Sequence, residues 1–173
     1  MGLLSRLFGR GLPDDFPGEL DRGEDVIAVA AVEGGGHLVV TGLGLWIPAD
    51  GGARRVGWHL VGKASWSEGE FVLTESAETG HFGDVVVLTD RAPVRFRLPD
   101  PGKVPHQVRL RVDGSVRSRH RQELGSGGAW FVQRKLPGRD GVVIQVRPDP
   151  GTDPALVEAI AGDVARKLAK PGE

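Results

Sequence analysis

Residues 57–64, GWHLVGKA, come nearest to a catalytic motif, because they match the spacing G-x-x-x-x-G-K of phosphate-binding loops. Such a loop needs Ser or Thr after the Lys to hold Mg²⁺, and a helix must follow so that its N-terminus faces the phosphate. Ala64 occupies the Ser/Thr position, and bulky side chains such as Trp58 fill the inner positions. We therefore expect this segment to form β structure without a phosphate site.

Histidine and cysteine offer no other catalytic pattern. The chain has no Cys, which excludes a disulfide framework, a thiol nucleophile and Cys-ligated zinc. Its five histidines include no pair at the i, i+4 spacing of zinc proteases, and no G-x-S-x-G motif marks a serine hydrolase. We predict that the chain is not an enzyme and has no cofactor and no metal site. The alternative is an enzyme or small-ligand binder whose site forms only in three dimensions from distant histidines and carboxylates.

Basic residues concentrate in residues 103–121, which hold six of them against one acidic residue, although the whole chain has a net charge of −1. The candidate binding residues are Lys103, Arg109, Arg111, Arg117, Arg119 and Arg121, extended by Arg54, Arg55, Arg95 and Arg97 if their strands are adjacent. This set suits anionic lipid headgroups, nucleic acid or an acidic partner, or else it is a solvated face that pairs with acidic residues of the same chain. No aromatic residues are interleaved with the cations, which disfavours nucleic acid.

The first ten residues have the pattern of a short amphipathic arm, since its apolar residues share one helical face: Leu3, Leu4, Leu7 and Phe8. One or two turns are marginal alone, so we expect the arm to dock on its own domain or on a partner, and an interfacial membrane anchor is the alternative. Residues 11–25 follow as a Pro-containing connector with six acidic residues and one basic residue, typical of an exposed segment. No stretch reaches the ~20 apolar residues of a membrane-spanning helix.

Short apolar runs separated by glycine-containing turns extend from residue 26 to residue 98, which is typical of antiparallel strands in a sandwich or small barrel. Residues 103–116 have valines at every fourth position and favour a helix. Residues 117–122 are compatible with a polar strand or a loop, and apolar runs follow at 129–132 and 142–146. We expect the tryptophans to pack in the core: Trp46, Trp58, Trp66 and Trp130.

The clearest helix begins at Asp153, a good N-cap, with Pro154 at the first helical position. Its predicted apolar stripe has a spacing of four: Leu156, Ile160, Val164 and Leu168. The chain has 173 residues, 39% of them hydrophobic, enough for one domain with an extension. We therefore predict the α+β class with mainly antiparallel β structure. The many Arg, Gly and Ala residues, with five Lys and no Asn, suggest a GC-rich bacterial genome.

Five short runs carry a resemblance to a known family: LDRGEDVIAVA (20–30), LVVT (38–41), LWIP (45–48), RRVGW (54–58) and VRFRLP (94–99). Through them, residues 20–98 resemble the PH-like domains of bacteria, in particular an uncharacterised actinobacterial group. The resemblance implies a bent antiparallel β-barrel with a capping helix over residues 20–116, and residues 117–173 as a strand–strand–helix extension packed on that domain. The first hairpin, EGGGH at 33–37, lacks the basic residues with which lipid-binding PH domains hold phosphoinositides.

Together these patterns predict a non-enzymatic PH-like interaction module that binds a protein partner or a membrane-associated assembly. One alternative is a binder of anionic lipid or nucleic acid through residues 103–121. The other is the enzyme or small-ligand binder named above. The absence of Cys favours a reducing compartment. We therefore expect a cytoplasmic protein, with contact to the inner face of the membrane and homo-oligomerisation left open.

Overall fold

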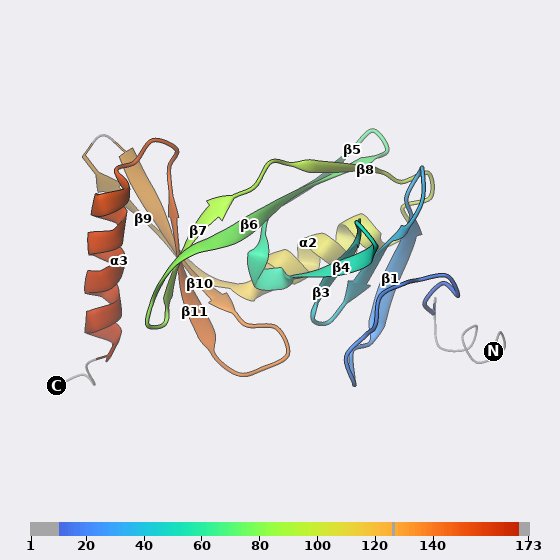
Figure 1. The fold of residues 1–173 in the computed structure, drawn as a ribbon, viewed down its shortest axis with the longest axis horizontal. Helices are drawn as coiled ribbons and strands as arrows, with labels where there is room; N and C mark the ends of the chain where they lie inside the picture. The colour runs from blue at the N-terminus through green and yellow to red at the C-terminus, as the bar shows by residue number, and fades with distance from the viewer. Residues whose placement is uncertain (1–10, 126, 170–173) are drawn as a thin grey trace. The chain divides into compact units, whose positions relative to one another are not determined.

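The computed structural model describes residues 11–125 and 127–169 and divides them into two compact units. Unit 1 holds residues up to 75 together with 92–114, and unit 2 holds residues 76–91 together with those from 115 onward. Figure 1 traces the elements of both units along the chain. Residues 76–91, expected within the first domain, therefore belong with the C-terminal part of the chain.

The first sheet of unit 1 is an antiparallel meander in the order β1–β2–β3–β4. Its strands are β1 (Val26–Ala31), β2 (His37–Thr41), β3 (Gly44–Ala49) and β4 (Gly52–Gly57). Gly34, Gly35 and Gly36 turn the chain between β1 and β2 with φ values of 95°, 128° and 80°, which residues with a side chain rarely adopt. This turn was predicted from the three consecutive glycines.

The second sheet of unit 1 consists of β5 (Val61–Ser67), the first part of β6 (Glu70–Phe82), and β8 (Val94–Arg97). Both β5 and β8 pair antiparallel with β6. The short 3₁₀ helix η1 (Trp58–Leu60) joins β4 to β5, so the segment with phosphate-loop spacing runs through β structure, as expected. A two-residue turn at Glu68 and Gly69, with φ values of 52° and 80°, connects β5 to β6.

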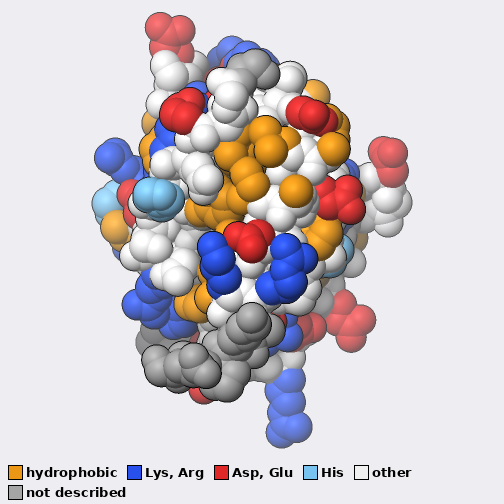
Figure 2. Space-filling view, turned by 90° about the vertical axis from the view of Figure 1, so that its left-hand side faces the viewer, with side chains coloured by type: hydrophobic (Ala, Val, Ile, Leu, Met, Phe, Trp, Pro, Cys, Tyr) orange, Lys and Arg blue, Asp and Glu red, His pale blue; other side chains and the backbone are white. Residues whose placement is uncertain are grey.

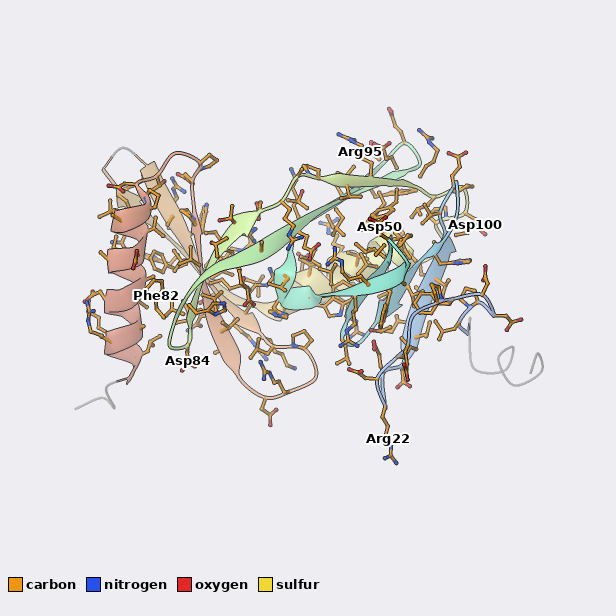
Figure 3. The ribbon with its side chains drawn as sticks, in the orientation of Figure 1. Arg22, Asp50, Phe82, Asp84, Arg95 and Asp100 are labelled. Carbon is orange, nitrogen blue, oxygen red and sulfur yellow. The ribbon has the colours of Figure 1, made fainter. Side chains whose placement is uncertain are left out.

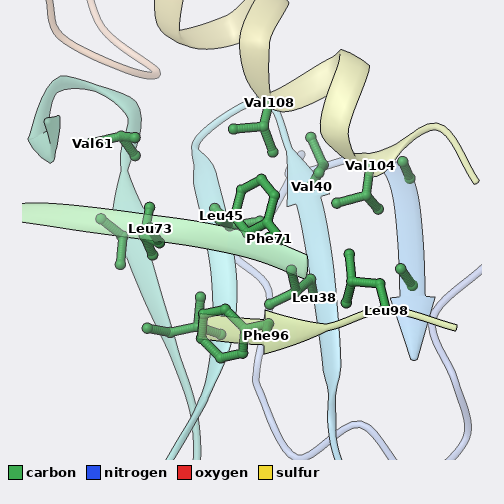
Figure 4. Packing of buried hydrophobic residues seen from close by; sticks show 14 of the residues in the cluster. Leu38, Val40, Leu45, Val61, Phe71, Leu73, Phe96, Leu98, Val104 and Val108 are labelled. Atoms are coloured by element: carbon green, nitrogen blue, oxygen red, sulfur yellow. The ribbon is translucent and has the colours of Figure 1, made fainter. Parts of the chain in front are cut away.

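Helix α2 (Val104–Ser115) completes the core of unit 1 and confirms the helix predicted at 103–116. Val104 and Val108 are fully buried against apolar side chains of both sheets, among them Leu38 and Phe71 (Figure 4). Val116 lies in the following strand and not in the helix. The predicted spacing of four is thus correct for the residues that face the core.

Unit 2 contains the second part of β6, then β7 (Val85–Asp90), β9 (Val116–Leu124), β10 (Gly127–Lys135), β11 (Val142–Pro148) and α3 (Pro154–Ala169). The strand order is β6–β7–β11–β10–β9. Only the β7–β11 pairing is parallel in this sheet. The polar segment at 117–122 is therefore a strand, and the extension holds three strands and a helix.

Helix α3 packs on one face of this sheet through a stripe that matches the predicted one in part. Val157 and Ala161 are buried, whereas Leu156 is 38% exposed and Leu168 is 51% exposed. Figure 2 views the α3 side and shows hydrophobic side chains exposed there. Ile160 and Val164 are partly buried and pack against the same core, beside Ala165, so the predicted stripe is correct for these two residues and wrong for Leu156 and Leu168.

Two of the four tryptophans follow the expectation of core packing. Trp46 and Trp58 are buried, and the Trp58 indole donates to the backbone oxygen of Thr41 at 3.0 Å. The expectation is wrong for Trp66 and Trp130, which are 37% and 41% exposed. Trp66 lies on the edge strand β5, so one side of its ring has no neighbouring strand to cover it. Trp130 lies on β10, between β11 and β9, and the Arg121 guanidinium is 5.6 Å from the centre of its ring. The class predicted from the sequence, α+β with mainly antiparallel β structure, is the class observed.

Candidate functional site

The ten predicted cations are distributed over both units, seven in unit 1 and three in unit 2. Arg54 on β4 forms a bidentate pair with Glu75, with Nη–Oε distances of 2.8 and 2.7 Å. Its hydrogen bonds to that carboxylate raise the pKa of Arg54. On β8, Arg95 pairs with Glu70 at 2.6 Å and extends outward from the ribbon (Figure 3).

The other cations of unit 1 vary in how far they are neutralised. Arg97 lies 3.6 Å from Glu33, and Arg109 lies 3.8 Å from Asp113 on the same helix. Lys103 and Arg111 are exposed and form no ion pair among the described residues. Most of the predicted basic residues in this unit therefore form ion pairs with carboxylates. The sequence alone did not identify these partners.

Arg55 belongs to a buried cluster that the sequence did not predict. The carboxylate of Glu24, in the connector expected to be exposed, has no exposed surface and lies 2.5 Å from Arg55 Nη1. It also accepts hydrogen bonds from the Thr41 hydroxyl at 3.0 Å and the Trp46 indole at 3.1 Å. The Arg55 guanidinium lies 5.5 Å from the centre of the Trp46 ring. These contacts tie the connector to β2, β3 and β4, so Arg55 has a structural role.

In unit 2, Arg117, Arg119 and Arg121 lie along β9. Arg121 pairs with Asp149 at 2.6 Å and with Glu123 at 2.8 Å, and its guanidinium is 5.6 Å from the Trp130 ring centre. These hydrogen bonds raise the pKa of Arg121 and lower the pKa of Asp149. Arg117 and Arg119 are exposed and have no ion pair in the described part of the chain. Six of the ten predicted cations are thus already paired.

The predicted arm residues Leu3, Leu4, Leu7 and Phe8 lie outside the described residues. No helix in the described ranges is long and apolar enough to cross a membrane. The histidines and carboxylates described here form no group of three that could hold a metal ion.

A groove in unit 1, which we call the β5 groove, was not predicted. It runs between β5 and α2, has a volume of about 440 Å³, and is lined by Ala64, Ser65, Trp66, Phe71, Pro105, His106, Arg109 and Asp113. Trp66 pairs with Phe71 across the strands and Ala64 pairs with Leu73, and both partners are core residues. Paired residues share a face, so the side chains of Ala64 and Trp66 are on the side of the sheet that packs against α2.

The backbone of β5 adds hydrogen-bonding groups to this groove. Ser67 and Glu70 flank the two-residue turn and therefore bond to each other, so the next residue, Trp66, directs its N–H and C=O away from β6. The same alternation applies to Ala64. Within residues 11–125 and 127–169, no strand pairs with this edge of β5. The groove thus combines a free strand edge, a partly exposed indole and an apolar floor.

The alternation of Lys63, Ser65 and Ser67 with Ala64 and Trp66 could have indicated a half-exposed strand. It could not have indicated that helix α2 lies beside it, because that contact joins residues about 40 positions apart. The chemistry available in the groove is recognition of an extended chain, since strand edges bind peptide backbones and grooves bind alternate side chains.

Comparison with models of protein families, with curated proteins and with solved structures gives no match for this chain. The functional interpretation therefore rests on the geometry of the two units.

Proposed function

We propose that this chain is a non-enzymatic interaction module whose first unit is PH-like and binds an extended segment of a protein partner along β5. The observation that carries the proposal is the edge of β5, which no strand of the described residues pairs with, beside the β5 groove and its two aromatic lining residues, Trp66 and Phe71. The order of elements in unit 1 supports the PH-like assignment, because a four-stranded meander, a three-stranded sheet and a core-completing helix follow one another. Residues 76–91 interrupt this order, because they belong to unit 2.

The proposed partner segment adds one strand to the edge of β5. Its backbone bonds the outward N–H and C=O groups of Ala64 and Trp66, and an apolar side chain enters the groove against Trp66 and Phe71. Arg109 and Asp113 on the rim have opposite charges and lie 3.8 Å apart, so the rim has no net charge that would favour an acidic or a basic side chain. The pairing of six predicted cations with carboxylates favours this partner over a polyanion.

The test places proline at an outward position of β5. Ala64→Pro removes an outward N–H and leaves the β5–β6 hydrogen bonds intact, because proline is tolerated at sheet edges. The matched control is Ala53→Pro on β4, also an edge strand, where Ala53 follows the pair Ala49–Gly52 at a two-residue turn and directs its N–H outward by the same rule.

Peptides selected from a random library on the immobilised full chain serve as probes. We expect the wild-type chain and Ala53→Pro to bind them equally, and Ala64→Pro to bind at least about tenfold more weakly, which corresponds to about 1.4 kcal/mol. In amide NMR spectra, the peptides should shift Ala64, Trp66 and α2 residues. Equal losses in both proline variants, or shifts confined to other elements, contradict the proposal.

A further inference from the structure

Unit 2 contains a second groove, which we call the α3 groove, with a volume of about 690 Å³. Every residue that lines it belongs to unit 2, at the ends of β6, β7 and β11, in the β11–α3 loop or in the first turns of α3. Figure 3 shows one of these residues, Phe82, beside α3. Sites that bind small organic molecules have volumes of about 300–1,000 Å³, so the groove is large enough for such a ligand.

The α3 groove opens where β7 and β11 separate, and a proline explains why their pairing ends there. Ile144 donates its N–H to the Asp84 carbonyl at 3.2 Å, at the start of the parallel pairing. Every second residue of β11 repeats this pattern two residues further along β7, which brings position 148 to the Leu88 carbonyl. Pro148 has no N–H to donate, and both Pro148 and Leu88 line the groove. The groove therefore contains a backbone acceptor that β11 leaves without a donor.

The one guanidinium among the lining residues is already held by neighbouring side chains. Arg147 on β11 pairs with Asp90 on β7, and its Nη2 atom also donates to the hydroxyl of Ser76 at 2.8 Å. The same hydroxyl donates to Asp90 at 2.9 Å. These contacts direct the donors of Arg147 to partners within unit 2, so the groove is a poor site for an anion.

The lining of the α3 groove combines apolar surface with negative charge. Its apolar side chains come from the sheet and the helix and include Phe82, Val87 and Val157. Its charged side chains are three carboxylates and one guanidinium: Asp90, Asp149, Glu158 and Arg147. Asp90 is paired with Arg147 and Asp149 with Arg121, so Glu158 is the lining carboxylate without an ion pair among the described residues.

The positive end of the α3 dipole does not oppose this charge, because the first turn of the helix is capped. Asp153 accepts a hydrogen bond from the Ala155 N–H at 3.0 Å and places a carboxylate at the N-terminus of α3. The cap offsets the positive partial charge next to the groove. A cation in the groove therefore meets an acidic lining and a capped helix end.

This chemistry fits a small molecule with an apolar body and a protonated amine. An ammonium group has three donors and no acceptor, which matches a lining whose free polar groups are a carboxylate and a backbone carbonyl. We propose that the α3 groove binds a small organic amine, with the ammonium at Glu158 and the apolar body against Phe82 and Val157. The site lies within unit 2 and does not depend on the proposed role of β5.

Three probes of similar shape test the proposal on the isotope-labelled full chain: phenethylamine, phenethyl alcohol and phenylpropionate. They are positively charged, neutral and negatively charged near pH 7. We expect phenethylamine to shift the amide NMR signals of groove residues such as Thr89, Gly151 and Glu158 in a saturable way. The alcohol should bind about two- to fivefold more weakly, as for the loss of one solvent-exposed ion pair, and the carboxylate should give no saturable shift. Equal binding of the three probes, shifts confined to other elements, or no saturation with the amine overturns the proposal.

The role of Glu158 is tested by Glu158→Gln with the same probes. We expect phenethylamine to bind about two- to fivefold more weakly, and phenethyl alcohol to bind as it does to the wild-type chain. Asp163→Asn is the matched control on the same helix, because Asp163 pairs with Lys167 at 3.0 Å and does not line the groove. An equal effect of both substitutions, or an equal loss of amine and alcohol in Glu158→Gln, overturns the assignment of Glu158.

Discussion

Glu24 shows how a single buried carboxylate fixes the chain just before β1. It accepts hydrogen bonds from Thr41, Trp46 and Arg55, which lie on three different strands. A buried charge of this kind is tolerated only because each of its oxygens has donors, one of them a cation. Its neighbours in the connector, such as Arg22, are exposed (Figure 3). Among the acidic residues of the connector, Glu24 therefore has a structural function that the composition alone does not indicate.

We predict that Glu24→Gln lowers the free energy of unfolding by about 2 kcal/mol, the usual size of a lost hydrogen bond to a charged group. The amide keeps the shape of the side chain but removes the charge that balances Arg55. Urea unfolding measures the effect. Glu33→Gln is the control, because Glu33 is exposed and lies 3.6 Å from Arg97, and it should change stability by less than about 0.5 kcal/mol. Similar losses in both variants would refute the role of Glu24.

Arg134 makes the stability of unit 2 depend on pH in the alkaline range. Its side chain is buried and donates to the Ser115 hydroxyl at 3.1 and 2.8 Å. Burial lowers the pKa of this guanidinium to about 10, and the charges of Arg147 and Arg119 add to the effect. The unfolded chain holds the same proton to above pH 12. Between these values the unfolded state binds more protons, so the contribution of Arg134 to stability rises with pH.

We therefore expect the wild-type chain to gain about 1 kcal/mol of unfolding free energy relative to Arg134→Gln between pH 9 and pH 11. Urea titrations at both pH values measure the difference. Gln133→Ala, on the same strand, removes no titratable group, so its difference from the wild type should not change with pH. A constant difference for Arg134→Gln would show that the guanidinium keeps its ordinary pKa in the folded protein.

At the scale of elements, two substitutions in α3 show which face of the helix stabilises unit 2. Val157→Ala should cost about 2 kcal/mol, because the removed methyl groups leave a space in the core of unit 2. Leu156→Ala removes more apolar volume from the neighbouring position but should cost less than about 1 kcal/mol, since Leu156 is 38% exposed. Thermal or urea unfolding of the two variants provides the comparison. The reverse order of costs would restore the stripe predicted from the sequence.

The elements with strong local signals could be predicted from the sequence. The glycine turn at 34–36, helix α2 and the start of α3 at Asp153 all follow from residues close together in the chain. Strand β9 was ambiguous because it lies at an edge and is almost entirely polar, so it lacks the apolar alternation of a covered strand. The basic residues were identified, but their carboxylate partners could not be, because they are up to 64 positions away in the chain, as for Arg97 and Glu33.

The two grooves could not be predicted for the same reason. The β5 groove depends on the contact of β5 with α2, and the α3 groove depends on where the β7–β11 pairing ends. Both are determined by tertiary packing, which no local pattern of apolar residues specifies. Only the components, such as the alternation in β5 and the N-cap of α3, are encoded locally.

For the whole molecule, the division into two units makes a prediction about fragments. Residues 115–173 should not fold alone, because Phe82, Val85 and Val87 from the β6–β7 hairpin complete their core. We expect a disordered amide NMR spectrum for this fragment. A chain that joins residues 76–91 to 115–173 through a Gly/Ser linker should recover dispersed signals. Dispersed signals from the shorter fragment would contradict the assignment of residues 76–91 to unit 2.

The parallel pairing of β7 with β11 also sets the order of events during protein synthesis. Val85 pairs with Ile144, which the ribosome adds 59 residues later. The β6–β7 hairpin must therefore wait with its apolar side chains uncovered while β9, β10 and β11 are being made. Such long-range pairings form slowly and leave chains open to aggregation. The second core closes only after β11 and α3 have been made, so chaperones and proteases have their longest access to the nascent chain at residues 76–91.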